Sequence, residues 1–262
     1  LVHGDTALTP YSTGTWGSRS MVMAGGAVAT TCRLLADRLK KIGAHLLQAH
    51  PKDVTFERGR VVSGQAEISI AEIAHTWYLA PQRLPVDVDP GGLEVTAGYK
   101  PKSDHGTFSY ATHAALVAVD PGVGLVEILD YFVVEDAGQL VNPTIVEGQI
   151  FGGVAQGIGT GLYECSPYDS AGQPLASTFM DYLVPGFTEV PEIRLEHMKT
   201  PSPYTEFGVK GLGEGGVIAP AAALLNAVND ALRPRRAVVT DQPVTPARIL
   251  AALRAAGTEP AR

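Results

Sequence analysis

Apolar residues recur along this chain with two different periods, which separate expected helices from expected strands. Between Ala24 and His50 they lie three, four and seven positions apart, a spacing that predicts an amphipathic helix. Pro51, directly after this segment, is a normal helix stop. Four later helices are expected, over residues 70–79, 145–163, 217–232 and 246–256.

Local start signals support two of these later helices. Ser69-Ile70-Ala71-Glu72 is a capping box, in which the serine and the glutamate each satisfy a backbone N–H at the helix start. Thr245 is a suitable N-cap, and Pro246 fits the first helical position.

Elsewhere the period is two, which predicts β-strands. The expected strands are Val54–Glu57, Arg60–Val62, Leu93–Tyr99, Thr107–Val119, Leu125–Val134 and Glu192–His197. Asp120-Pro121-Gly122 has turn chemistry, so the strands on either side of it are expected to form a hairpin. Strands and helices come in mixed blocks without a βαβ rhythm. The predicted fold class is therefore α+β, in one domain over residues 1–262 with no firm internal boundary.

Composition narrows the class of protein. Hydrophobic residues make up 45% and charged residues 18% of 262, which is a normal globular mixture. A net charge of −7 argues against nucleic acid as a partner, because phosphate binding needs a basic face. No apolar run is long enough for a membrane span, and no secretory signal opens the chain. The 2 cysteines cannot hold an iron–sulfur cluster, and a cytoplasmic location is expected.

Glycines form two clusters, which indicate close backbone approach rather than flexible linker. The first cluster recurs about every four residues in the expected helix 145–163, so one helix face is nearly bare backbone. This face suits either tight helix packing or a bulky cofactor, with Gln149 and Gln156 offering amide contacts. The Gly157-Ile158-Gly159-Thr160-Gly161 sequence lies late in that helix, where a dinucleotide-binding turn does not occur.

The second cluster surrounds a single carboxylate, in Gly208-Val209-Lys210-Gly211-Leu212-Gly213-Glu214-Gly215-Gly216. The glycines keep other side chains away, so Glu214 is expected in a narrow, partly dry place, where burial favours general-base chemistry. A helix starting near Gly216 would instead favour the charged form of the Glu214 carboxylate, because the N-terminus of a helix carries partial positive charge. An incidental glutamate in a loop before that helix is the alternative.

A third candidate segment, Gly17-Ser18-Arg19-Ser20, precedes the first long helix. Its backbone N–H groups and two hydroxyls suit an anion, because a helix N-terminus carries partial positive charge. An ordinary helix cap explains the same residues without a ligand.

Together these segments resemble the molybdenum hydroxylases, the xanthine oxidase and aldehyde oxidoreductase family. The strongest stretches are Asp136-Ala137-Gly138 with Asn142-Pro143, Glu147-Gly148-Gln149-Ile150 through Gly159, and Lys210 through Glu214. They occur in order over nearly the whole chain, which makes the set more specific than any one stretch. The resemblance is to the C-terminal half of the molybdopterin-binding large subunit, and it implies the mixed α+β fold of that second molybdopterin-binding domain.

The resemblance also implies roles for individual residues. Glu214 falls on the family's active-site glutamate, the base that takes a proton from the attacking oxygen. Gln149 falls on the glutamine that hydrogen-bonds the pterin. Lys210 falls on a lysine expected to anchor the catalytic loop and to offer Glu214 a charge partner. The remaining cofactor-binding positions are Gly17, Ser18, Arg19, Ser20 and Gly213, whereas molybdenum is expected to be held through the pterin dithiolene.

The family's large subunit is much longer, so this chain is expected to be a split subunit or a fragment that exposes an apolar, glycine-lined surface. The implied cofactor is molybdenum–molybdopterin in its cytosine dinucleotide form. The implied partners are the N-terminal half of the molybdopterin subunit, an iron–sulfur subunit with 2Fe–2S and an FAD subunit. The implied reaction hydroxylates an aldehyde or N-heteroaromatic carbon with oxygen from water. A carbon monoxide dehydrogenase-like subunit and a non-catalytic assembly protein of the same fold are the alternatives.

Overall fold

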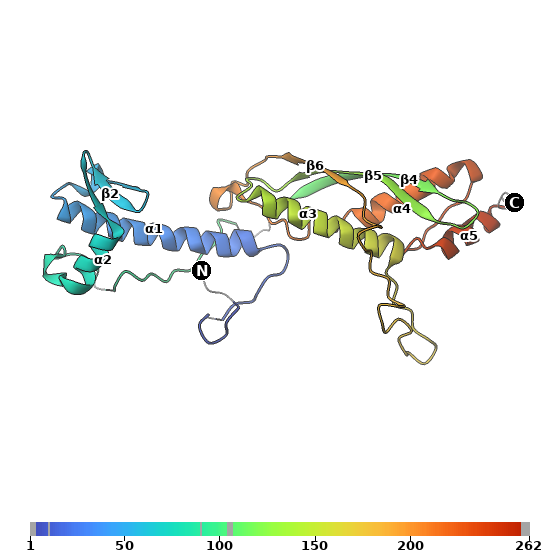
Figure 1. Cartoon of the computed structure of the whole chain (residues 1–262), viewed down its shortest axis with the longest axis horizontal. Helices are drawn as coiled ribbons and strands as arrows, with labels where there is room; N and C mark the ends of the chain where they lie inside the picture. The colour runs from blue at the N-terminus through green and yellow to red at the C-terminus, as the bar shows by residue number, and fades with distance from the viewer. Residues whose placement is uncertain (1–3, 10, 90, 104–106, 258–262) are drawn as a thin grey trace. The chain divides into compact units, whose positions relative to one another are not determined.

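The computed structural model describes residues 4–9, 11–89, 91–103 and 107–257 (Figure 1). Contacts divide the chain into two compact units, of which one spans residues 22–102 and the other joins residues 1–21 to residues 103–262. The sequence has no shift in composition at these borders, so the division follows from contacts in space. Helix α1 (Ser20–Leu46) begins in the larger unit and continues in the smaller one.

The smaller unit packs helices on a short antiparallel sheet. The sheet has the order β1-β2-β3, with bounds Thr55–Glu57, Arg60–Ser63 and Ala66–Ser69. Helix α2 (Ile70–Leu79) follows directly, and the predicted capping box between Ser69 and Glu72 is confirmed. Short 3-10 turns lie at Pro51–Asp53 and Pro81–Arg83. The core of this unit is apolar, with Leu39, Ile42, Val61 and Ile73 all buried.

The predicted strand Leu93–Tyr99 is wrong. The segment is extended but pairs with no described strand. Its alternating exposure has another cause, because it lies along α1: a Cβ on Gly26 would meet the Tyr99 ring at 2.5 Å. Arg38 of α1 also donates hydrogen bonds to the backbone carbonyls of Gly92 and Glu94. Contact with a helix therefore produces the same period as a half-buried strand.

The larger unit contains a mixed sheet of three strands. Strands β4 (Tyr110–Val119) and β5 (Val126–Asp136) form the predicted hairpin, and the Asp120 carboxylate accepts from the Gly122 N–H at its turn. Strand β6 (Ile193–Met198) lies parallel to β5 on the other side. The β5–β6 connection is long and contains a helix, as parallel pairing requires.

Three helices complete the larger unit: α3 (Pro143–Ile158), α4 (Pro220–Leu232) and α5 (Pro246–Ala255). The expected helix 145–163 ends earlier as an α-helix and continues as a π-helical turn, Gly159–Tyr163. The remaining 3-10 turns are Glu206–Gly208 and Arg233–Arg235. Side chains from α3, α4 and α5 pack with one face of the sheet in a core that includes Tyr131, Ile150, Leu224 and Ile249. Mixed strands and helices confirm the predicted α+β class.

Large apolar side chains remain exposed on the larger unit, in agreement with the expected apolar surface. One group lies on the sheet face opposite the core and includes Leu116, Phe132, Val134 and Met198. A second group, including Phe179, Met180 and Phe187, belongs to the long loop between Tyr163 and β6, which extends away from the sheet (Figure 1). None of the described helices is long and apolar enough to cross a membrane.

Candidate active site

A direct contact between Ser18 and Glu214 brings the two candidate loops together. The Ser18 hydroxyl donates to Glu214 Oε2 over 2.8 Å. The same hydroxyl oxygen accepts from the Glu214 backbone N–H over 3.0 Å. One side chain therefore fixes both the backbone and the carboxylate of the candidate base.

The approach of the two loops requires glycine at Gly211. A Cβ there would lie 2.5 Å from the carbonyl oxygen of Ser18, closer than real contacts allow. On the other loop, Gly17 and Ser18 both have left-handed backbone, with φ of +57° and +58°. Glycine adopts this conformation without cost, whereas a serine there must be held by its surroundings. The two contacts with Glu214 supply that support.

The glycine face of α3 has two parts with different roles. Towards its C-terminal end it packs tightly: a Cβ on Gly153 would meet backbone atoms of Gly216 at 2.8 Å, and one on Gly157 would meet the Pro220 ring. A Cβ on Gly148 or Gly152 would meet nothing within 4 Å. Helix packing therefore explains the second part of the stripe, while the first part leaves open space.

Gln149 is exposed on α3 beside this open part. A Cβ on Gly213 would lie 3.6 Å from Gln149 Oε1, so the amide adjoins the residue that precedes Glu214. Within the described residues nothing hydrogen-bonds the Gln149 amide. The structure thus brings Ser18, Gln149, Gly213 and Glu214 into one cluster built from three segments.

The expected pairing of Lys210 with Glu214 is wrong. The Lys210 ammonium is buried, and it forms an ion pair with Asp136 Oδ1 over 3.0 Å. It also lies 4.7 Å from the centre of the Tyr110 ring, a favourable cation–π arrangement. A buried ammonium needs such partners, because desolvation without them costs several kcal/mol. Lys210 therefore faces into the fold, away from the cluster.

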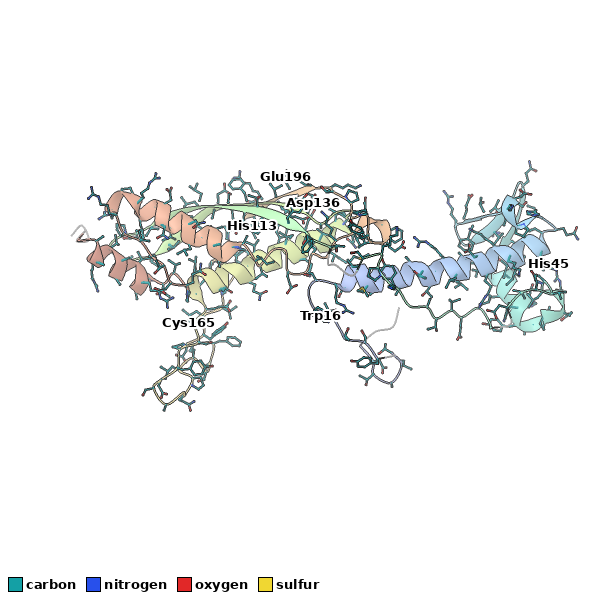
Figure 2. The ribbon with its side chains drawn as sticks, turned by 180° about the vertical axis from the view of Figure 1, so that it is seen from behind. Trp16, His45, His113, Asp136, Cys165 and Glu196 are labelled. Carbon is teal, nitrogen blue, oxygen red and sulfur yellow. The ribbon has the colours of Figure 1, made fainter. Side chains whose placement is uncertain are left out.

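Burial works to raise the pKa of Asp136, but its hydrogen bonds outweigh this. Thr200, the Gly138 N–H and Lys210 all donate to the carboxylate and hold the pKa of Asp136 well below its usual range. Figure 2 labels Asp136 at the end of strand β5. The carboxylate is therefore ionised at neutral pH and serves as a structural anion.

The remaining loop residues lie at the start of α1. Arg19 is half-buried, with its guanidinium 5.0 Å from the centre of the Trp16 ring, which Figure 2 labels. The Ser20 hydroxyl shares a hydrogen bond with Thr15 over 2.6 Å. Gly17 is exposed, and a Cβ there would meet nothing within 4 Å. The space beside Gly17 is therefore open, and it lies just before the N-terminus of α1.

Glu214 itself is exposed, so the expected narrow and dry surroundings are not formed by the described part of the chain. Helix α4 begins at Pro220, several residues beyond the expected start, and residues 213–219 form turns. The close contact of Gly216 with Gly153 explains the delay, since it holds the chain against α3. The open side of the cluster faces solvent in this chain.

Two residues that hold Lys210 have no role in the sequence reasoning above. Asp136 belongs to the stretch Asp136-Ala137-Gly138, but the sequence analysis gives its carboxylate no role. An aspartate at the end of an apolar strand is nevertheless a signal that the carboxylate is buried with a partner. Tyr110, whose hydroxyl donates to Asp136 over 3.2 Å, gives no signal in the sequence.

Comparison with known proteins identifies the family. The sequence matches the molybdopterin cofactor-binding domain over residues 1–191. The nicotine 6-hydroxylase large subunit of Paenarthrobacter nicotinovorans is 41% identical over 254 residues, which cover 96% of this chain. The chain belongs to the molybdenum hydroxylase family. The carbon monoxide dehydrogenase large chain of Hydrogenophaga pseudoflava is 32% identical to this chain, over 96% of the residues of this chain.

Solved structures confirm the fold. This chain superposes on quinoline 2-oxidoreductase from Pseudomonas putida 86 with a TM-score of 0.87 and 37% identity, over 95% of the residues of this chain. It covers 32% of that chain, and 31% of the nicotine 6-hydroxylase subunit. It therefore spans about a third of the length of these relatives.

The residues present fit a pterin cofactor. An amide without a hydrogen-bond partner among the described residues, at Gln149, adjoins the open backbone of Gly148 and Gly152. Hydroxyl groups and a helix N-terminus lie on the Ser18 loop, and these are the donors that phosphate and ring nitrogens require. In the described residues no three or more His, Cys, Asp or Glu side chains are grouped so as to hold a metal ion.

Proposed function

We propose that this chain forms the catalytic C-terminal part of the large subunit of a molybdenum hydroxylase, with Glu214 as the general base. The observation that carries this proposal is the cluster of Ser18, Gln149 and Glu214 at one exposed place. A non-catalytic assembly protein of the same fold has no use for an exposed carboxylate that a serine hydroxyl orients in this way.

The chain's own residues divide the work of the site. Glu214 accepts a proton at Oε2 or Oε1, and the Ser18 hydroxyl keeps the carboxylate in one orientation. Gln149 binds the pterin through its amide, and the Gly17–Ser20 segment and Gly213 lie against the cofactor through backbone and hydroxyl groups. When bound, the molybdenum cofactor supplies the redox-active metal that accepts electrons from the substrate. We assign it the cytosine dinucleotide form.

The proposed substrate is an N-heteroaromatic compound, which is hydroxylated with oxygen from water. The names of two relatives support this class, since one is a nicotine 6-hydroxylase and the other a quinoline oxidoreductase. Carbon monoxide is the second candidate, supported by the carbon monoxide dehydrogenase large chains at 32% identity. Assays of the same enzyme with quinoline, nicotine, an aldehyde and carbon monoxide separate these substrates.

The proposed partners are the rest of the molybdopterin subunit, an iron–sulfur subunit with 2Fe–2S and an FAD subunit. Exposed apolar side chains on the outer face of the β4–β6 sheet support a covering partner, because large apolar patches are rare on free proteins. We place the complex in the cytoplasm, where the exposed thiols of Cys32 and Cys165 stay reduced. Metal analysis and identification of the chains that co-purify test this composition.

The test of the base is the E214Q variant in the complete enzyme. Glutamine keeps the shape and the Ser18 contact but cannot accept the proton, so we expect turnover to fall by about 10²–10⁴-fold. Molybdenum content should not change. The matched control is E192Q, an exposed glutamate in the same unit, which should keep wild-type turnover. Wild-type turnover by a molybdenum-loaded E214Q enzyme would refute the proposed function.

A further inference from the structure

We propose that Asp136 is a positioning residue for the Glu214 base, which it holds in place through a buried ion pair with Lys210. This inference rests on the proposed function, and it concerns what fixes the catalytic loop rather than what the loop does. Asp136 is fully buried at the end of β5. Glu214 lies four positions after Lys210 in the catalytic loop, residues 208–216.

The Asp136 carboxylate collects donors from four separate places. Oδ1 accepts from Lys210 Nζ over 3.0 Å, from the Gly138 N–H over 2.9 Å and from the Thr200 N–H over 3.2 Å. Oδ2 accepts from the Tyr110 hydroxyl over 3.2 Å. One side chain thus joins the start of β4, the end of β6, the turn after β5 and the catalytic loop.

The backbone around Lys210 also contacts the turn that follows β5. The Lys210 N–H donates to the Ala137 carbonyl over 3.0 Å, and Gly138 forms an isolated antiparallel bridge with Val209. The approach is close, since a Cβ on Gly138 would lie 2.4 Å from the Gly208 carbonyl oxygen. The ion pair and the backbone bonds therefore hold residues 208–210 against the end of β5 and the turn after it.

Glu214 follows this anchor after only three residues, Gly211, Leu212 and Gly213. Glycines have little conformational preference of their own, so the position of Glu214 depends on its two hydrogen bonds with Ser18 and on how each end of the segment is held. Beyond Glu214, Gly216 rests on Gly153 of α3. The Lys210–Asp136 pair therefore anchors the segment on the N-terminal side of Glu214, and loss of the pair should let Glu214 move.

The neighbouring residue offers a matched control. Glu135 is also buried, and its carboxylate contacts His197 Nδ1 of β6 over 2.5 Å. Successive residues of a strand point to opposite faces, so Glu135 and Asp136 lie on different sides of the sheet. The Glu135 carboxylate hydrogen-bonds His197 of β6, and it makes no hydrogen bond with the described residues of the catalytic loop. The E135Q variant removes a buried carboxylate that interacts with Lys210 and Asp136 only through space, so it leaves the hydrogen bonds of the proposed anchor in place.

The test compares D136N, K210M and E135Q in the complete enzyme, by amide hydrogen exchange and by steady-state kinetics. For D136N and K210M we expect faster exchange over residues 208–216. Their kcat should fall by about 100-fold, because a displacement of about 1 Å is enough for such a loss, while KM and molybdenum content change little. E135Q should lose thermal stability, yet keep wild-type exchange over residues 208–216 and wild-type kcat.

The double variant D136N/K210M leaves no buried charge alone, so it serves if a single variant fails to fold. It should fold, with the same rise in exchange. Wild-type exchange over residues 208–216 in the folded variants would overturn the proposal, as would an equal loss of kcat in E135Q. Hydrogen exchange needs no turnover, so this result stands apart from the E214Q test of the proposed function.

Discussion

The Ser18 hydroxyl donates a hydrogen bond to the Glu214 carboxylate over 2.8 Å, and it accepts one from the Glu214 N–H over 3.0 Å. The two residues are separated by 196 positions in the chain. A hydroxyl that donates to one group and accepts from another fixes both partners at once. The loop that contains Ser18 thereby orients the proposed base, Glu214, which lies far away in the sequence.

Removal of the Ser18 hydroxyl should lower turnover. In S18A the carboxylate of Glu214 loses its donor, and a loss of about 10-fold in kcat corresponds to the 1.4 kcal/mol that one such bond contributes. S18G also lacks the hydroxyl but suits the left-handed backbone, so equal loss in both variants assigns the effect to the hydroxyl. Steady-state kinetics at constant molybdenum content measures it.

The control for the Ser18 variants is S12A, in the same loop. The Ser12 hydroxyl accepts from the Gly14 N–H and lies outside the cluster. Its removal should leave kcat unchanged. If S18A and S18G both turned over like wild type, the Ser18 hydroxyl would have no part in orienting Glu214.

Two glycines of α3 should respond oppositely to alanine. In G153A the new Cβ would meet backbone atoms of Gly216 and Val217 at 2.8–2.9 Å, so the chain after Glu214 must shift. Such crowding costs about 1–3 kcal/mol. In G152A the Cβ enters open space, and alanine is the better helix former by about 0.5–1 kcal/mol.

Urea unfolding of the two variants measures this difference in the free energy of unfolding. The sign separates the two residues, because G153A should be destabilised and G152A stabilised relative to wild type. Equal stability of both variants would show that α3 and the Gly216 turn do not pack as closely as described.

The Asp136 carboxylate should make the free energy of unfolding depend on pH. Its pKa in the folded chain is held below the ordinary value of 3.8, so the unfolded chain binds the proton more readily. The stabilising contribution is therefore complete above the unfolded pKa, and it is lost as the pH falls through the folded pKa. D136N has no such group, and its free energy of unfolding should fall less steeply on acidification.

Unfolding by urea at a series of pH values from neutral to about 3 checks this sign, because the difference between the two proteins is set by proton binding to Asp136. The difference in free energy of unfolding between wild type and D136N should shrink as the solution becomes more acidic. A difference independent of pH would mean that the Asp136 carboxylate keeps an ordinary pKa in the fold.

Arg38 should hold the extended segment of the smaller unit. Its guanidinium forms an ion pair with Asp89 over 2.6 Å and donates to the carbonyls of Gly92 and Glu94. R38M keeps the apolar length of the side chain but removes these bonds, of which those to the backbone carbonyls contribute about 1.5–3 kcal/mol each because the donor is charged. Faster amide exchange over residues 91–99 would report the release.

D89N is the control for Arg38, since it removes only an exposed charge. Asp89 is largely exposed, and exposed ion pairs contribute about 0–1 kcal/mol. We expect near-wild-type exchange in D89N. A larger effect in D89N than in R38M would show that the ion pair, and not the bonds to the backbone, fixes this segment.

The sequence by itself determined most of the helices and strands and the candidate residues of this protein, although it missed strand β3. Apolar periodicity placed the long helices and the β4–β5 hairpin within a few residues, because that pattern follows from which side chains a helix or strand can bury. The capping box at Ser69 was predicted because its contacts are local. The resemblance pointed to Ser18, Gln149, Lys210 and Glu214, whose roles remain predictions.

Only the tertiary structure decided how these residues meet. The contact of Ser18 with Glu214, the pairing of Lys210 with Asp136 and the contact of Gly153 with Gly216 all join segments far apart in the chain. Local sequence patterns carry no information on contacts between distant segments. They also predicted a strand over Leu93–Tyr99, where the alternating exposure comes from contact with α1. The partner of a buried charge is set by packing and desolvation, which depend on the whole fold.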